Sequence, residues 1–107
     1  MNSKEEAVVF NIISSAGEAS AHFLKAIKLA EEEGEFKKAY EELKKGEEVS
    51  LAAHKEQTKL IQREVSGEKI ETGILMIHAQ DHLMNSILLK DLAKSIVSLN
   101  EKLYRSK

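Results

Sequence analysis

The chain of 107 residues contains no cysteine, no proline and no tryptophan, and it has only five glycines. Without cysteine, disulfide bonds and thiolate chemistry are excluded, and this composition fits a reducing compartment. Without proline, and with so little glycine, few positions would interrupt an α-helix. Aromatic residues are also sparse, at 5% of the chain. Together these absences predict long helices that are broken only where glycine occurs.

An excess of one charge and a long hydrophobic run are also absent. Charged residues make up 32% of the chain, but the net charge is only −2, so the basic surplus of a nucleic-acid or anionic-membrane binder is missing. No apolar run approaches the roughly 18 residues of a membrane-spanning helix. The stretch "MNSKEEAVVFNII" has a short apolar run behind two glutamates, so we expect no secretory signal. The length predicts a single domain over residues 1–107.

Glycine marks two breaks in the helical pattern. The first is "EEEGEF" at residues 31–36 and the second is "VSGEKIE" at residues 65–71. They divide the chain into predicted helices at 3–33, 35–66 and 69–105. Because both connections are short, successive helices should run antiparallel. The predicted fold class is all-α, an antiparallel three-helix up-down-up bundle.

Two further glycines, Gly17 and Gly46, fall inside the predicted helices. Glycine in a helix interior costs about 1 kcal/mol relative to alanine, so it usually has a packing or functional reason. We expect both glycines to let helices approach closely or bend.

The third predicted helix carries an apolar stripe whose members are three or four residues apart, as in a packed helix pair or a coiled coil. Its members are Ile74, Ile77, Asp81, Met84, Leu88, Leu92, Ile96, Leu99 and Leu103. The other sides of this helix are also apolar over residues 74–89. Two partner helices of a small bundle rarely cover so much apolar surface. The pattern therefore favours an oligomer built around the third helix.

Asp81 places a carboxylate within this stripe, where an unpaired charge would be costly to bury. In a cyclic oligomer the copies of Asp81 would meet at the axis, and a hard divalent cation would compensate their charge. Alternatively, Asp81 is partly exposed and bonded to a nearby lysine or histidine. Spacing alone leaves both interpretations open.

Two histidines, His78 and His82, flank Asp81 and are four residues apart, so they share one side of a helix. Three interpretations are open. The first is that they are structural histidines held by hydrogen bonds. The second is that they bind a metal together with Asp81, as part of its ligand set. The third is that one is a nucleophile and the other assists it. A neutral imidazole is a good nitrogen nucleophile near neutral pH, and a neighbouring acceptor fixes its tautomer.

The segment "HAQDHLM" at residues 78–84 resembles the signature sequence of the lactose/cellobiose family of enzyme IIA proteins, from the sugar phosphotransferase system. The resemblance extends along nearly the whole chain. "ISSAGEASAHFLKAI" is similar to the family's first helix, "AAHKEQTKLIQ" at 52–62 to its second, and "SILLKDLAKSIVSLNEKLY" to its C-terminal helix. One departure is Ala19-Ser20-Ala21, where the family's first helix carries Ala-Arg-Ser.

This resemblance implies a cytoplasmic homotrimer that relays phosphoryl groups. The histidine-containing phosphocarrier protein would phosphorylate Nε2 of His78, which would pass the group to a cysteine of enzyme IIB. The sugar taken up would be a β-linked disaccharide of the cellobiose, chitobiose or lactose class. Three copies of Asp81 would hold a divalent cation, Mg²⁺ in our expectation. Gln80 and His82 would orient and hydrogen-bond the phosphoryl group.

Two other histidines receive structural interpretations. We expect His54 to tie the second helix into the bundle through a hydrogen bond, and His22 to lie on the surface. The competing hypothesis for the whole protein is a non-enzymatic metal-binding or adaptor bundle, whose third helix only oligomerises or recruits a partner helix.

Overall fold

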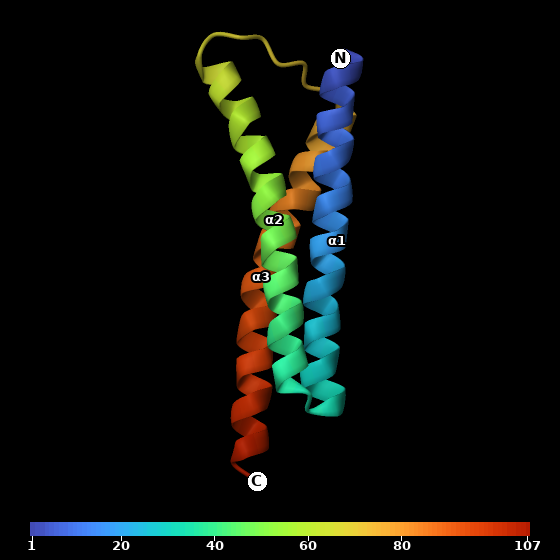
Figure 1. Ribbon diagram of the computed structural model, residues 1–107. Coiled ribbons are helices and arrows are strands. Elements are labelled where there is room, and N and C mark those ends of the chain that lie inside the picture. Colours follow the sequence, from blue (N-terminus) through green and yellow to red (C-terminus); the bar gives the residue numbers. More distant parts are fainter.

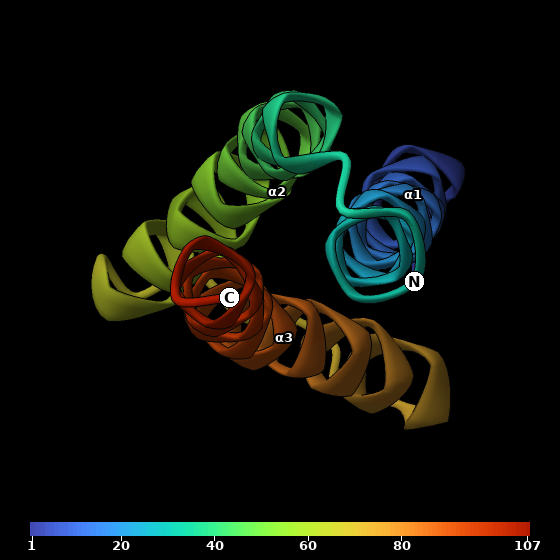
Figure 2. The same cartoon turned by 90° about the horizontal axis from the view of Figure 1, so that it is seen from below.

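The computed structural model describes residues 1–107 as three long helices and no strand (Figure 1). These are α1 (Ser3–Glu33), α2 (Phe36–Val65) and α3 (Ile74–Arg105). They form an antiparallel up-down-up bundle of 57 × 21 × 19 Å, and the end-on view shows α1, α2 and α3 surrounding a common interior (Figure 2). The predicted fold class is confirmed. None of the three helices combines the length and the apolar character that crossing a membrane requires.

The first break lies where the sequence predicts it. Gly34 adopts a left-handed conformation with φ of 64°, which costs glycine little because it has no Cβ atom. The backbone N–H of Glu35 then donates to the carbonyl oxygen of Leu29 at 3.0 Å, which satisfies a carbonyl at the end of the helix. At the other end of α1, the side chain of Asn2 accepts a hydrogen bond from the N–H of Glu5.

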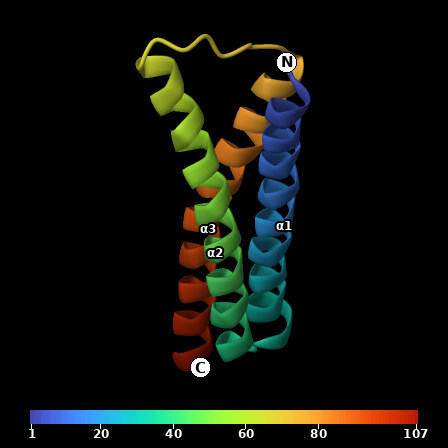
Figure 3. The same cartoon turned by 45° about the horizontal axis from the view of Figure 1, so that its top comes forward.

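The predicted start of the third helix is wrong by five residues, because α3 begins at Ile74 rather than at residue 69. Gly67 has a φ of 101°, which ends the α2 geometry, and Gly73 is extended. The chain therefore crosses from α2 to α3 as an irregular segment, residues 66–73. At this end of the bundle α2 and α3 diverge, and the segment bridges them (Figures 1 and 3).

The close helix approach predicted at Gly46 is confirmed. A Cβ atom at this position would lie 2.5 Å from Cε1 of Phe23, a ring that is fully buried in α1. At Gly17 the structure shows no close approach, because nothing lies within 4 Å of where its Cβ would be, and a bend at this glycine stays a prediction. Packing therefore requires glycine at position 46 and not at position 17.

The prediction that His22 lies on the surface is wrong. Its side chain is 25% exposed, and Nδ1 lies 2.6 Å from a carboxylate oxygen of Glu42 in α2. The Glu42 side chain is only 8% exposed, and the ammonium groups of Lys25 and Lys45 lie 3.5 and 3.4 Å from it. The hydrogen bond from His22 holds the pKa of Glu42 below its ordinary value of 4.5, against the opposing effect of burial and with help from both lysines.

Glu42→Gln is expected to lower the free energy of unfolding by about 1–3 kcal/mol near neutral pH, because it removes the carboxylate charge from a buried hydrogen bond between α1 and α2. A carboxyl whose folded pKa is depressed stabilises the protein above the unfolded pKa, and this stabilisation is lost as the pH falls through the folded pKa. The difference between wild type and variant should therefore shrink below about pH 4.5. Urea denaturation across this range measures it. A gap that stays constant down to about pH 3 would show that the carboxylate charge is irrelevant.

Candidate functional site

His78 and His82 lie together on the first half of α3, as their spacing predicts. Their ring centroids are 4.3 Å apart, and the rings meet edge to face at 79°. Both residues are exposed, and neither ring forms a hydrogen bond with another residue of the chain. An exposed imidazole without a partner keeps a ring nitrogen available to attack an electrophile.

Gln80 lies on a different side of α3 from these histidines. Residues two apart on a helix are rotated by about 200° and do not face each other. The side chain of Gln80 instead faces α2, where its Oε1 accepts a hydrogen bond from Nε2 of Gln57. Its own Nε2 lies 3.9 Å from the sulfur of Met76, which is a weak acceptor. Within one chain, therefore, the structure does not bring Gln80 to His78.

Gln57 is a residue that the sequence analysis did not single out. It is 7% exposed and is one of only four buried polar or charged residues in the chain. A signal was present, because Gln57 occupies a core-facing position of α2 between the buried Ala53 and Leu60. An amide at such a position needs a hydrogen-bond partner, and Gln80 provides one.

Asp81 is exposed on the outer side of α3, between Ile77 and Met84, whose side chains are each 52% exposed. It forms no ion pair within the chain, so the bonded-lysine or bonded-histidine alternative is not found there. One chain also holds no group of three or more histidine, cysteine, aspartate or glutamate side chains arranged to bind a metal ion. A metal at Asp81 would need ligands from other copies.

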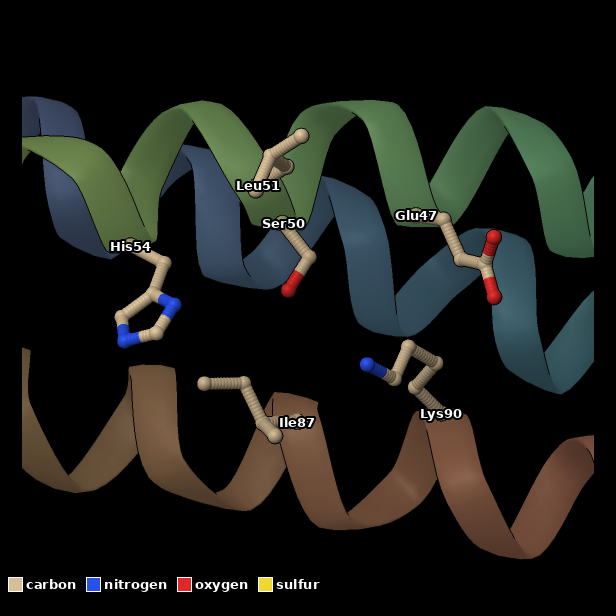
Figure 4. A pocket seen from close by; sticks show the side chains of 6 residues that line it. All are labelled: Glu47, Ser50, Leu51, His54, Ile87 and Lys90. Atoms are coloured by element: carbon tan, nitrogen blue, oxygen red, sulfur yellow. The ribbon is translucent and has the colours of Figure 1, made fainter.

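The predicted hydrogen bond from His54 into the bundle is wrong. The His54 ring is exposed and forms no hydrogen bond, and it lies at a groove of about 320 Å³ between α2 and α3 (Figure 4). The groove is lined by Glu47, Ser50, Leu51, His54, Ile87 and Lys90. Lys94 forms an ion pair with Glu47 beside it. This ion pair, rather than an imidazole hydrogen bond, joins α2 to α3 here.

Three comparisons with known proteins agree. The family model described as "PTS system, Lactose/Cellobiose specific IIA subunit" matches residues 7–101. The lichenan-specific phosphotransferase enzyme IIA component of Bacillus subtilis is 42% identical over 103 residues, covering 96% of this chain and 93% of that protein. The crystal structure of the cellobiose-specific enzyme IIA of Bacillus anthracis is 39% identical, with a TM-score of 0.94 over 100% of this chain and 97% of that one.

A further structure shows a relative with a partner. The solution structure of the complex between the chitobiose enzyme IIA and HPr of Escherichia coli matches with a TM-score of 0.79 and 33% identity. The match covers 92% of this chain and 95% of that one. Family, relatives and fold all point the same way over nearly the full length of the chain. The chain therefore belongs to the lactose/cellobiose-specific enzyme IIA family of the phosphotransferase system, and it takes part in phosphoryl transfer as such a component.

Proposed function

We propose that His78 accepts a phosphoryl group on Nε2 from HPr and passes it to a cysteine of enzyme IIB, during uptake of a β-linked disaccharide. The observation that carries this proposal is the exposed, unbonded imidazole at the first position of the family's "HAQDHLM" sequence. A relative of this chain forms a complex with HPr, which supports HPr as the donor. A donor and an acceptor that visit in turn both need access to one ring nitrogen, and the position of His78 provides it.

The chemistry requires little acid-base catalysis. Phosphoryl transfer through a loose transition state depends mainly on in-line positioning and on stabilising charge on the transferred oxygens. The ring of His82 touches that of His78 at its edge, so an N–H of His82 can donate a hydrogen bond to the phosphoryl oxygens. We assign His82 this supporting role.

We propose that three chains assemble around α3. The stripe predicted from the sequence is not covered by α1 or α2, since seven of its apolar side chains are more than half exposed. These are Ile74, Ile77, Met84, Leu88, Leu92, Leu99 and Leu103. A contiguous apolar surface of this kind marks an interface. Completing the burial of each side chain would contribute roughly 1 kcal/mol, enough in sum to hold a homotrimer together.

A trimer around this stripe brings three Asp81 carboxylates to its axis. Each is free of partners within its own chain and lies between apolar neighbours, which fits the oxygen ligands that Mg²⁺ prefers. We propose that the three Asp81 side chains hold one such divalent cation. When bound, the ion would neutralise carboxylates that otherwise repel one another.

The same assembly gives Gln80 access to a phosphoryl site. Ala79 and Leu83 are fully buried against the bundle, so the Asp81 side of α3 points outward, with His78 on one flank and Gln80 on the other. In a cyclic assembly each copy turns one flank to the next copy and the opposite flank to the previous one. We therefore propose that Gln80 supports the phosphoryl group on His78 of the neighbouring subunit.

The alternative of a non-enzymatic metal-binding or adaptor bundle has less support. His78 and His82 are in edge-to-face ring contact and exposed, as a phosphoryl acceptor and its support would be. The apolar stripe would suit an adaptor, but an adaptor needs neither exposed imidazole. No observation favours this function over the relay.

The direct test is phosphoryl labelling. The protein is incubated with enzyme I, HPr and radiolabelled phosphoenolpyruvate, and the labelled residue is located by peptide mapping. We expect an acid-labile, alkali-stable label on His78 that disappears when enzyme IIB is added. A label on another residue, or none with active enzyme I and HPr, would contradict the assignment.

A further inference from the structure

The buried amide pair between α2 and α3 has a direction that matters for the proposed relay. Nε2 of Gln57 donates to Oε1 of Gln80, so the only acceptor atom of the Gln80 side chain is turned toward α2. The Nε2 group of Gln80 meets only a sulfur at 3.9 Å, so its donor capacity remains almost unused. An amide held in this way presents N–H groups, and not a carbonyl oxygen, to anything that approaches α3 from outside.

Gln57 is well placed to fix this orientation. It is 7% exposed, whereas Gln80 is half-buried at the edge of the bundle. Its own Nε2 also lies 3.9 Å from the sulfur of Met84, a second weak acceptor. Gln57 forms the last side-chain hydrogen bond from α2 to α3 before the connecting residues 66–73.

We infer that Gln57 is a positioning residue for phosphoryl transfer: it locks the amide of Gln80 so that Nε2 donates to the phosphoryl group on His78 of the neighbouring subunit. This inference rests on the proposed phosphoryl site and trimer. A phosphoryl group carries oxygens that only accept hydrogen bonds, so a donor stabilises it and a carbonyl oxygen repels it. An unlocked Gln80 would present either end.

The test reverses the direction of the hydrogen bond between residues 57 and 80. In Gln57→Glu the carboxylate can only accept, so Gln80 must turn its Nε2 inward and present its carbonyl oxygen to the phosphoryl group. We expect the rate of phosphoryl transfer from phosphorylated HPr to fall by about tenfold, the effect of losing one charge-assisted hydrogen bond. The matched control is Gln62→Glu, which makes the same charge change at an exposed glutamine of α2 and should transfer at the wild-type rate.

A second variant without a charge is needed, because the buried carboxylate of Gln57→Glu could disturb folding. Gln57→Leu fills a similar volume with an uncharged side chain that forms no hydrogen bond, so Gln80 is free to rotate. Its rate of phosphoryl transfer should lie between those of wild type and Gln57→Glu. In Gln80→Ala there is no amide to orient, and adding Gln57→Glu to it should cause no further loss. Wild-type transfer by both Gln57 variants would overturn the inference. So would losses from Gln57→Glu and Gln80→Ala that simply add.

Mixed trimers separate the two subunits' contributions. Chains with Gln57→Glu keep His78, while chains with His78→Ala keep the intact amide pair. If the pair serves the neighbouring copy, random 1:1 mixing should return about half of the His78-bearing chains to the wild-type rate. No recovery would place Gln57 within its own subunit's site and overturn the inference. If His78 were not the acceptor at all, the wild-type label would map to another residue or be absent, which is a different outcome.

Discussion

His78→Ala is expected to abolish phosphoryl acceptance from HPr. The substitution removes the nitrogen to which phosphorus would bond, and alanine offers no nucleophilic atom in its place. Because His78 is exposed and contributes no core packing, the variant should unfold at the same temperature as wild type. Gel autoradiography after incubation with enzyme I, HPr and labelled phosphoenolpyruvate measures the loss.

Two other histidines provide the controls for this experiment. His54→Ala removes another exposed imidazole, from the α2–α3 groove, and it should be labelled like wild type. His82→Ala keeps the acceptor but removes the ring in contact with it, so its labelling should slow on the order of tenfold without being lost. A label that survives in His78→Ala, or that vanishes in His54→Ala, would show that the acceptor has been misassigned.

Much of the fold follows from local signals in the sequence. Gly34 correctly predicts the turn between the first two helices, because it adopts a left-handed conformation that other residues rarely adopt. The second turn was predicted less well. Residues 69–73 contain no strong helix breaker before Gly73, so the pattern did not show that α3 starts only at Ile74.

The candidate site was harder to predict, because its partners are distant in the sequence. The bond from Gln57 to Gln80 spans 23 residues. Outside the site, the bond from His22 to Glu42 likewise spans 20. No periodicity within one helix reveals which residue of the next helix lies opposite. Conversely, His78 and Gln80 are neighbours in the sequence, yet they lie on opposite flanks of α3. The continuous motif thus joins residues that serve different surfaces of one chain.

Asp81→Leu is expected to keep the proposed trimer, or to tighten it, without metal. At the axis of the proposed assembly, wild-type Asp81 brings three carboxylates together, and removing their counter-ion leaves repulsion and a desolvation cost. Leucine would extend the apolar stripe between Ile77 and Met84 instead. Replacing buried charges by well-packed apolar side chains is often neutral or stabilising by about 1–4 kcal/mol. The variant should therefore stay trimeric in EDTA, under conditions where the wild type becomes less stable.

Light scattering and thermal unfolding, each with and without EDTA, measure this effect. Asp91→Leu is the matched control: Asp91 is 68% exposed on the same helix and lies outside the stripe, 3.9 Å from the ammonium of Lys90. That substitution should leave the response to EDTA as in wild type. If Asp81→Leu falls apart into monomers, the cation bound by the carboxylates is the main attraction between subunits. The apolar stripe would then be too weak to hold the trimer, against what its seven half-exposed side chains indicate.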